Sequence, residues 1–155
     1  VLIAERRSSE AIDPLREAAE GILPDPAVLW LLGCAWLEVT RYDEAEQAFE
    51  RALAANPDFA DAHVGLARVH AKRRQWDDVV DHTLSAVTIE HHRPVAHYLL
   101  GVALFNLNLP DRALLAFRNA LQLAPGWKQA ERWVYNLQHG LVPPPLEARD
   151  VRLRI

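Results

Sequence analysis

Residues 26–59 read PAVLWLLGCAWLEVTRYDEAEQAFERALAANPDF, and residues 94–126 follow the same pattern. The Leu-Gly pair at 32–33 returns as Leu-Ala at 66–67 and as Leu-Gly at 100–101, which is a period of 34 residues. Three further series share this period, and they are Ala45, Val79 and Ala113; Phe49, Thr83 and Phe117; and Ala52, Ala86 and Ala120. Since several independent positions keep one spacing, the chain is predicted to be a tandem repeat.

Each repeat is predicted to form two helices. Apolar residues recur every three or four positions through six stretches, which are 27–39, 43–55, 61–73, 77–89, 95–107 and 111–123. Turn-forming residues such as Asn56-Pro57-Asp58 separate them, and short connections favour antiparallel neighbours. Small residues at Gly33, Ala67 and Gly101 are expected where the two helices of a pair approach closely. One pair cannot bury its apolar faces alone, so the pairs are predicted to stack into an all-α fold.

The order of a large residue, Leu-Gly, an aromatic residue, and then Ala, Phe, Ala and Pro resembles the tetratricopeptide repeat family. The resemblance identifies 26–59 as repeat 1, 60–93 as repeat 2 and 94–126 as repeat 3. Repeat 2 is degenerate, because Val79, Thr83 and His91 replace the usual small residue, aromatic residue and proline. The resemblance implies a right-handed superhelix of stacked antiparallel helix pairs, a TPR-like solenoid.

The flanking segments extend this pattern. Residues 8–22 are predicted to be the second helix of a truncated preceding repeat, and Pro14 would either kink this helix or delay its start. Residues 127–139 are predicted to be a capping helix that ends at Gly140. Residues 140–155 are predicted to be an extended tail or linker, because they contain three consecutive prolines; the alternative is that they lie against this stack or a neighbour's.

In this family the first helices of successive pairs line a concave groove. The resemblance places a set of apolar, aromatic and basic residues in that groove, namely Trp30, Cys34, Leu37, Val64, Arg68, Lys72, Tyr98, Val102, Phe105, Arg132 and Asn136. Aromatic and arginine side chains often dominate binding energies, so we expect a protein or peptide partner with apolar and some acidic side chains. The alternative is that Trp30, Tyr98 and Phe105 only pack between neighbouring helices.

One binding mode of the family is not expected. Members that hold the terminal carboxylate of a chaperone use a clamp of lysine, asparagine and arginine side chains. The matching positions here are Trp30, Cys34, Gly65, Val95 and Leu99, and none of them supplies such a group.

No chemistry-bearing motif stands out, so neither catalysis, nor a cofactor, nor a metal site is predicted. His63 and His97 fall one period apart at positions that usually hold packing residues, whereas His91-His92 is expected in an exposed turn. There is no nucleophile motif and no glycine-rich phosphate loop. Cys34 falls on the groove face, where it is either a reactive thiol or, as in most such positions, a small residue between helices.

The composition narrows the class of partner. The net charge is −4 with both signs interspersed, which argues against nucleic acid, and no apolar run is long enough to cross a bilayer. The single cysteine forms no internal disulfide, which favours a reducing compartment such as the cytoplasm. Since the chain contains no methionine, we expect it to be part of a longer protein. The leading hypothesis is a protein-protein interaction scaffold; the alternatives are a structural or self-association module, and an accessory domain of a larger enzyme.

Overall fold

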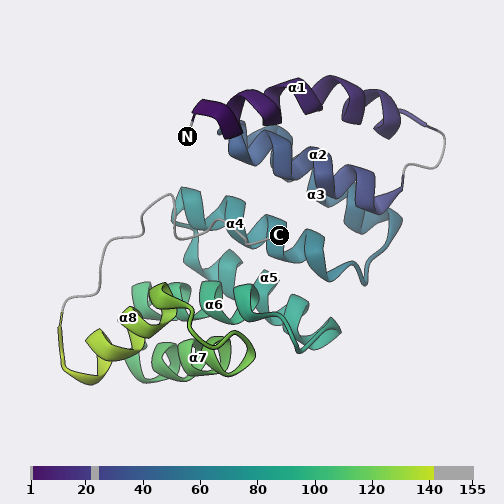
Figure 1. Ribbon diagram of the computed structural model, residues 1–155. Coiled ribbons are helices and arrows are strands. Elements are labelled where there is room, and N and C mark those ends of the chain that lie inside the picture. The colour runs from purple at the N-terminus through teal and green to yellow at the C-terminus, as the bar shows by residue number, and fades with distance from the viewer. Residues whose placement is uncertain (1, 22–24, 142–155) are drawn as a thin grey trace. The chain divides into compact units, whose positions relative to one another are not determined.

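The computed structural model describes residues 2–21 and 25–141, with side chains described from residue 7 onward. Throughout these residues the regular structure is α-helical, as predicted. The helices are α1 (Leu2–Ala19), α2 (Pro26–Glu38), α3 (Tyr42–Ala55), α4 (Ala60–Arg73), α5 (Trp76–Ile89), α6 (Pro94–Asn106), α7 (Pro110–Leu123) and α8 (Lys128–Gln138) (Figure 1). The six helices from α2 to α7 begin and end within one residue of the predicted ranges.

The turn inside each helix pair repeats with the period of the sequence. Thr40, Arg74 and Asn108 each adopt a positive φ, at 63°, 60° and 62°. The next residue in each turn then donates its N–H to a carbonyl near the end of the preceding helix, as Arg41 does to Trp36 O at 2.9 Å. This is a Schellman ending, which satisfies the last carbonyls of α2, α4 and α6 and reverses the chain.

The chain divides within α4 into two compact units, one ending at Val69 and the next beginning at His70. In the first unit α1 packs on α2, and α2 packs on α3 (Figure 1). The core gathers apolar residues from all four helices around the fully buried ring of Phe49. Arg51 on α3 also donates from Nη2 to the carbonyl of Ala19 at 2.9 Å, which fastens the end of α1 to the second helix of repeat 1.

Two glycines make room for Phe49. A Cβ built on either Gly33 of α2 or Gly65 of α4 would lie 2.5 Å from Phe49 Cε1. The predicted close approach at Gly33 is therefore confirmed, and so is its counterpart at Gly101, where a Cβ would lie 2.8 Å from Phe117 Cε1.

In the second unit α5 packs on α6, α6 on α7, and α7 on α8. Aromatic rings fill this core. Phe117 stacks on Trp133 with ring centroids 4.9 Å apart, and Tyr98 stacks on Trp127 at 4.7 Å. In the degenerate repeat, Thr83 is fully buried where the other repeats have phenylalanine, and its hydroxyl donates to Val79 O within the same helix at 2.8 Å. A buried hydroxyl is thereby satisfied without a partner from another helix.

The two flanking helices differ in how well they were predicted. α8 lies inside the predicted range 127–139, and Gly140 follows it with a positive φ of 65°. The prediction of 8–22 for the first helix was wrong at both ends, because α1 runs from Leu2 to Ala19 with Pro14 inside it. Good helix formers lie upstream of Pro14 and favour the helix there, although Pro14 lacks the N–H of a helical hydrogen bond and lowers the stability of α1. The tail predicted at 140–155 lies outside the described residues from position 142 on.

Candidate functional site

The first unit places Trp30 and Cys34 of α2 partly buried against its core. Leu37, the third predicted groove residue of this helix, is buried in that core at 5% exposure. On α4, Val64 and Arg68 are also buried, although Arg68 carries a charge. Of these five predicted residues, Trp30 and Cys34 thus retain partial exposure.

One N–H donor of Arg68 lacks a hydrogen-bond partner among the described residues. Its side chain is 8% exposed and its Nη2 lies 3.4 Å from Oε1 of Glu38, which is a long contact for a charged pair. Among the described residues, no group accepts a hydrogen bond from its Nε. A guanidinium offers five N–H donors, and the one on Nε is left unsatisfied in this buried position.

The Cys34 thiol lies beside the same guanidinium. Burial raises the pKa of this thiol to about 11. The charge of Arg68 and its side-chain hydrogen bond to the thiol lower the pKa in part, whereas the negative charges of Asp61 and Glu38 raise it. A thiol with this pKa is protonated at neutral pH and is a poor nucleophile. The arrangement therefore favours a packing role for Cys34 over a reactive one.

In the second unit, the predicted groove residues differ in how deeply they are buried. Tyr98 and Val102 are each 1% exposed and belong to the core with Phe117 and Trp133. For Tyr98 this is the packing arrangement expected as the alternative to a place in the groove. Phe105 is partly buried, with its ring 5.2 Å from that of Trp133.

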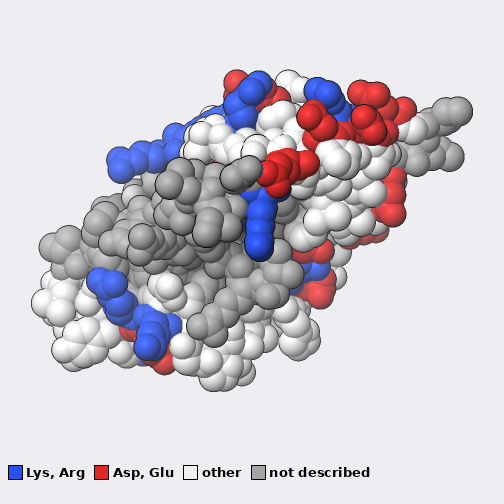
Figure 2. All heavy atoms as spheres, turned by 45° about the horizontal axis from the view of Figure 1, so that its top comes forward, with Lys and Arg blue, Asp and Glu red and all other residues white. Residues whose placement is uncertain are grey.

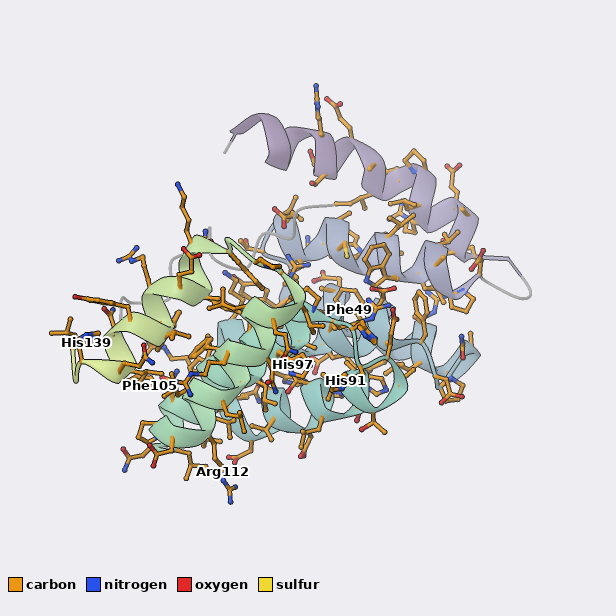
Figure 3. The ribbon with its side chains drawn as sticks, turned by 60° about the horizontal axis from the view of Figure 1, so that its bottom comes forward. Phe49, His91, His97, Phe105, Arg112 and His139 are labelled. Carbon is orange, nitrogen blue, oxygen red and sulfur yellow. The ribbon has the colours of Figure 1, made fainter. Side chains whose placement is uncertain are left out.

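The polar residues predicted for the groove in this unit are more accessible. Lys72 and Arg132 are exposed, and Asn136 on α8 is half-buried. Figure 3 shows Phe105 close to α8, with His139 at the end of that helix.

Two histidines repeat one structural role in successive repeats. His97 is 4% exposed, and its Nε2 lies 3.3 Å from the carbonyl oxygen of His91, whose ring is beside it (Figure 3). His63 makes the corresponding hydrogen bond to the carbonyl of Pro57, and burial lowers the pKa of both histidines. Each imidazole thus ties a first helix to the loop before it, which agrees with the packing role expected for these residues.

A further histidine pair was not expected from the sequence. His70 on α4 stacks on His82 of α5 with ring centroids 5.3 Å apart. The two belong to different helices twelve positions apart, so no helical spacing linked them. Within the described part of the chain, no three histidine, cysteine or acidic side chains form a group that could hold a metal ion.

The surface carries both signs of charge. Figure 2 shows basic and acidic side chains intermixed on the described atoms of the visible face. No helix among the described residues is both long and apolar enough to cross a membrane.

Comparison with known proteins gives one consistent result. A family model described as Tetratricopeptide repeat matches residues 37–81, and another of the same description matches 94–127. A curated relative, the E3 ubiquitin-protein ligase CHIP of Arabidopsis thaliana, is 29% identical over 83 residues, or 54% of this chain. The chain spans only 30% of the length of that relative.

Solved structures share the fold. MamA MSR-1 is 25% identical to this chain with a TM-score of 0.71, and the match covers 86% of this chain and 77% of MamA MSR-1. MamA from Desulfovibrio magneticus RS-1, residues 41 to its end, is 23% identical with a TM-score of 0.76, covering 89% and 81%. The first TPR of Spaghetti (RPAP3), bound to the HSP90 peptide SRMEEVD, is 20% identical with a TM-score of 0.73, covering 77% and 98%. These similarities place the chain among the all-α solenoids.

Proposed function

Since this chain belongs to the tetratricopeptide repeat family, we propose that it is an interaction module that binds a protein segment on the faces of its first helices. The family match supports a role in protein interaction rather than in catalysis. The observation that carries the proposal is that the first unit has a partly exposed Trp30 on α2 and, on α4, a buried Arg68 whose Nε has no acceptor among the described residues. Tryptophan and arginine are enriched among the residues that dominate binding energies in protein interfaces.

The second unit supports the same kind of partner. Phe105 is partly exposed on α6, and the exposed Arg132 and half-buried Asn136 lie on α8. A segment with apolar side chains and some acids complements both sets of residues. The HSP90 peptide in the Spaghetti complex shows that another protein of this fold binds a short segment.

The test measures binding of labelled, C-terminally amidated peptides by fluorescence anisotropy. We expect peptides that combine Leu, Phe or Trp with Glu to bind, and Trp30→Ala to weaken this binding by tenfold or more, about 1.4 kcal/mol or greater. Leu115→Ala is the matched control, because Leu115 is 61% exposed on α7, a second helix. Equal weakening by the two substitutions would refute the assignment of the face.

A second variant keeps this test open if Trp30→Ala loses helical circular dichroism. Arg132→Glu reverses an exposed charge on α8 and should leave the fold intact. We expect this substitution to weaken the binding of acidic peptides at low salt and to have less effect on binding at high salt. If neither variant alters binding, the first helices are not the binding faces.

A further candidate is that the chain serves as an accessory domain of a larger protein. The match to only 30% of the CHIP ligase supports this possibility, because the similar region is a small part of that enzyme. The reading frame around the chain tests it, and a frame with no further domain would exclude it. Self-association is tested by sedimentation across concentrations, where a mass that stays at the monomer value of 17.5 kDa would exclude a homo-oligomer.

A further inference from the structure

Arg68 is a buried cation with an incomplete set of acceptors. Its Nε has no hydrogen-bond partner among the described residues, and its contact with Glu38 is 3.4 Å long. Leaving a buried donor unsatisfied is unfavourable, and the penalty is larger for a charged group. An additional acceptor that hydrogen bonds to the guanidinium would therefore stabilise the protein.

The surroundings of Arg68 indicate which acceptor is suitable. Cys34 hydrogen bonds to the guanidinium, but a protonated thiol is a weak acceptor. Within the described part of the chain, Glu38 supplies the carboxylate that contacts Arg68, and its side chain is 30% exposed whereas that of Arg68 is 8% exposed. The negative end of the pair is thus the end that meets solvent.

We propose that Arg68 selects a carboxylate side chain of the partner segment and that Glu38 is its internal competitor. In the unbound protein Glu38 partly neutralises the buried charge. On binding, a Glu or Asp side chain of the partner takes over this role with a shorter, two-pronged hydrogen bond to the planar guanidinium. This proposal rests on the proposed function. It adds that Arg68 recognises the acidic side chain of the partner and that Glu38 competes with that side chain.

The long 3.4 Å contact between Arg68 and Glu38 agrees with such a role. An optimised internal salt bridge would hold Arg68 in place and leave it no capacity for a partner. Losing the contact with Glu38 would uncover a buried charge, so it is tolerated only because the partner carboxylate replaces it with a shorter contact. The bound segment replaces one carboxylate with another, so the buried cation is never left without an anion.

The test uses the full chain and an array of amidated nine-residue peptides. Their flanks vary among Leu, Phe, Trp and Ser, and their central residue is Glu or Gln. For the flanks that bind, we expect the Glu member to bind about tenfold more tightly than its Gln twin. Amidation removes the terminal carboxylate, so the preference reports on the side chain alone.

Two substitutions with opposite effects identify the residues. Arg68→Gln should abolish the Glu preference, whereas Glu38→Gln should increase it because the competitor is lost. Arg112→Gln is the charge-matched control, since Arg112 is exposed on α7 and points away from the helices in Figure 3. Glu38→Gln should also lower the melting temperature of the free protein, and the Glu peptide should restore more of it than the Gln peptide does.

The outcomes separate the two proposals. If no peptide binds to the wild-type chain, the groove of the proposed function is refuted. If peptides bind but Glu and Gln twins are equal, or the Glu preference survives Arg68→Gln, the role of Arg68 is refuted and the groove stands. If Arg68→Gln loses helicity, the Glu38→Gln arm decides, and an unchanged or reduced Glu preference in that variant overturns the proposal.

Discussion

Gly65→Ala tests the packing around Phe49 most directly. The new Cβ would lie 2.5 Å from Phe49 Cε1, whereas ordinary contact begins at 3.4 Å. The methyl group and the ring must therefore move apart by about 0.9 Å. The ring cannot supply it easily, because Phe49 is fully buried and Gly33 approaches the same three ring atoms just as closely. Overpacking of this kind costs about 1–3 kcal/mol.

The helix propensity of alanine opposes this cost. Gly65 lies inside α4, where alanine is favoured over glycine by about 1 kcal/mol. The net expectation is a loss of up to about 2 kcal/mol, which for a chain of this size lowers the melting temperature by up to about 8 °C. Thermal and urea unfolding followed by circular dichroism at 222 nm measures both quantities.

A smaller residue at position 49 provides the control. In a Phe49→Leu background the clash is relieved, so Gly65→Ala should become neutral or stabilising, and the double-mutant cycle should give a coupling of about 1 kcal/mol or more. The reasoning is wrong if Gly65→Ala raises the melting temperature of the wild-type chain. It is also wrong if the substitution has the same effect in both backgrounds.

Three further predictions concern other parts of the chain. With a thiol pKa of about 11 against an ordinary 9.0, Cys34 should react with iodoacetamide about 100-fold more slowly at pH 8 than an unperturbed thiol, and Arg68→Gln should slow it further; an equal or faster rate in that variant would contradict the contact. Burial lowers the pKa of His97 from 6.5, so the folded state favours the neutral imidazole. The contribution of His97 to the free energy of unfolding should therefore be fully present above about pH 6.5 and be lost as the pH decreases through the folded-state pKa. His97→Gln keeps an N–H donor but does not titrate, so unfolding curves should show a weaker acid dependence, and an unchanged dependence would exclude His97. Trp133→Ala should cost about 3–5 kcal/mol because Trp133 is 3% exposed, whereas Tyr135→Ala, at 57% exposed, should cost little; similar losses would mean that α8 is not held by its buried ring.

The sequence alone determined the repeat, the helix pairs and the family. A period of 34 residues in small and aromatic positions reports local helix geometry and close approach within a pair, and both are properties of neighbouring residues. The boundaries of α2 to α7 followed for the same reason. The upstream extension of α1 was missed because the predicted range 8–22 came from the register of the repeat, and the residues before position 8 lie outside that register.

The tertiary structure decided which residues of the predicted groove are buried and which partners surround them. Spacing placed Tyr98 and Phe105 in the same groove, but only packing showed that Trp127 and Phe117 enclose Tyr98 while Phe105 stays partly exposed. Gly65 lies outside the repeat pattern, so its contact with Phe49 depends on how α3 meets α4. The acceptor-poor state of Arg68 was equally invisible in the sequence. Periodicity fixes the face of a helix that a side chain occupies, whereas burial and hydrogen bonding depend on neighbours that are distant in the chain.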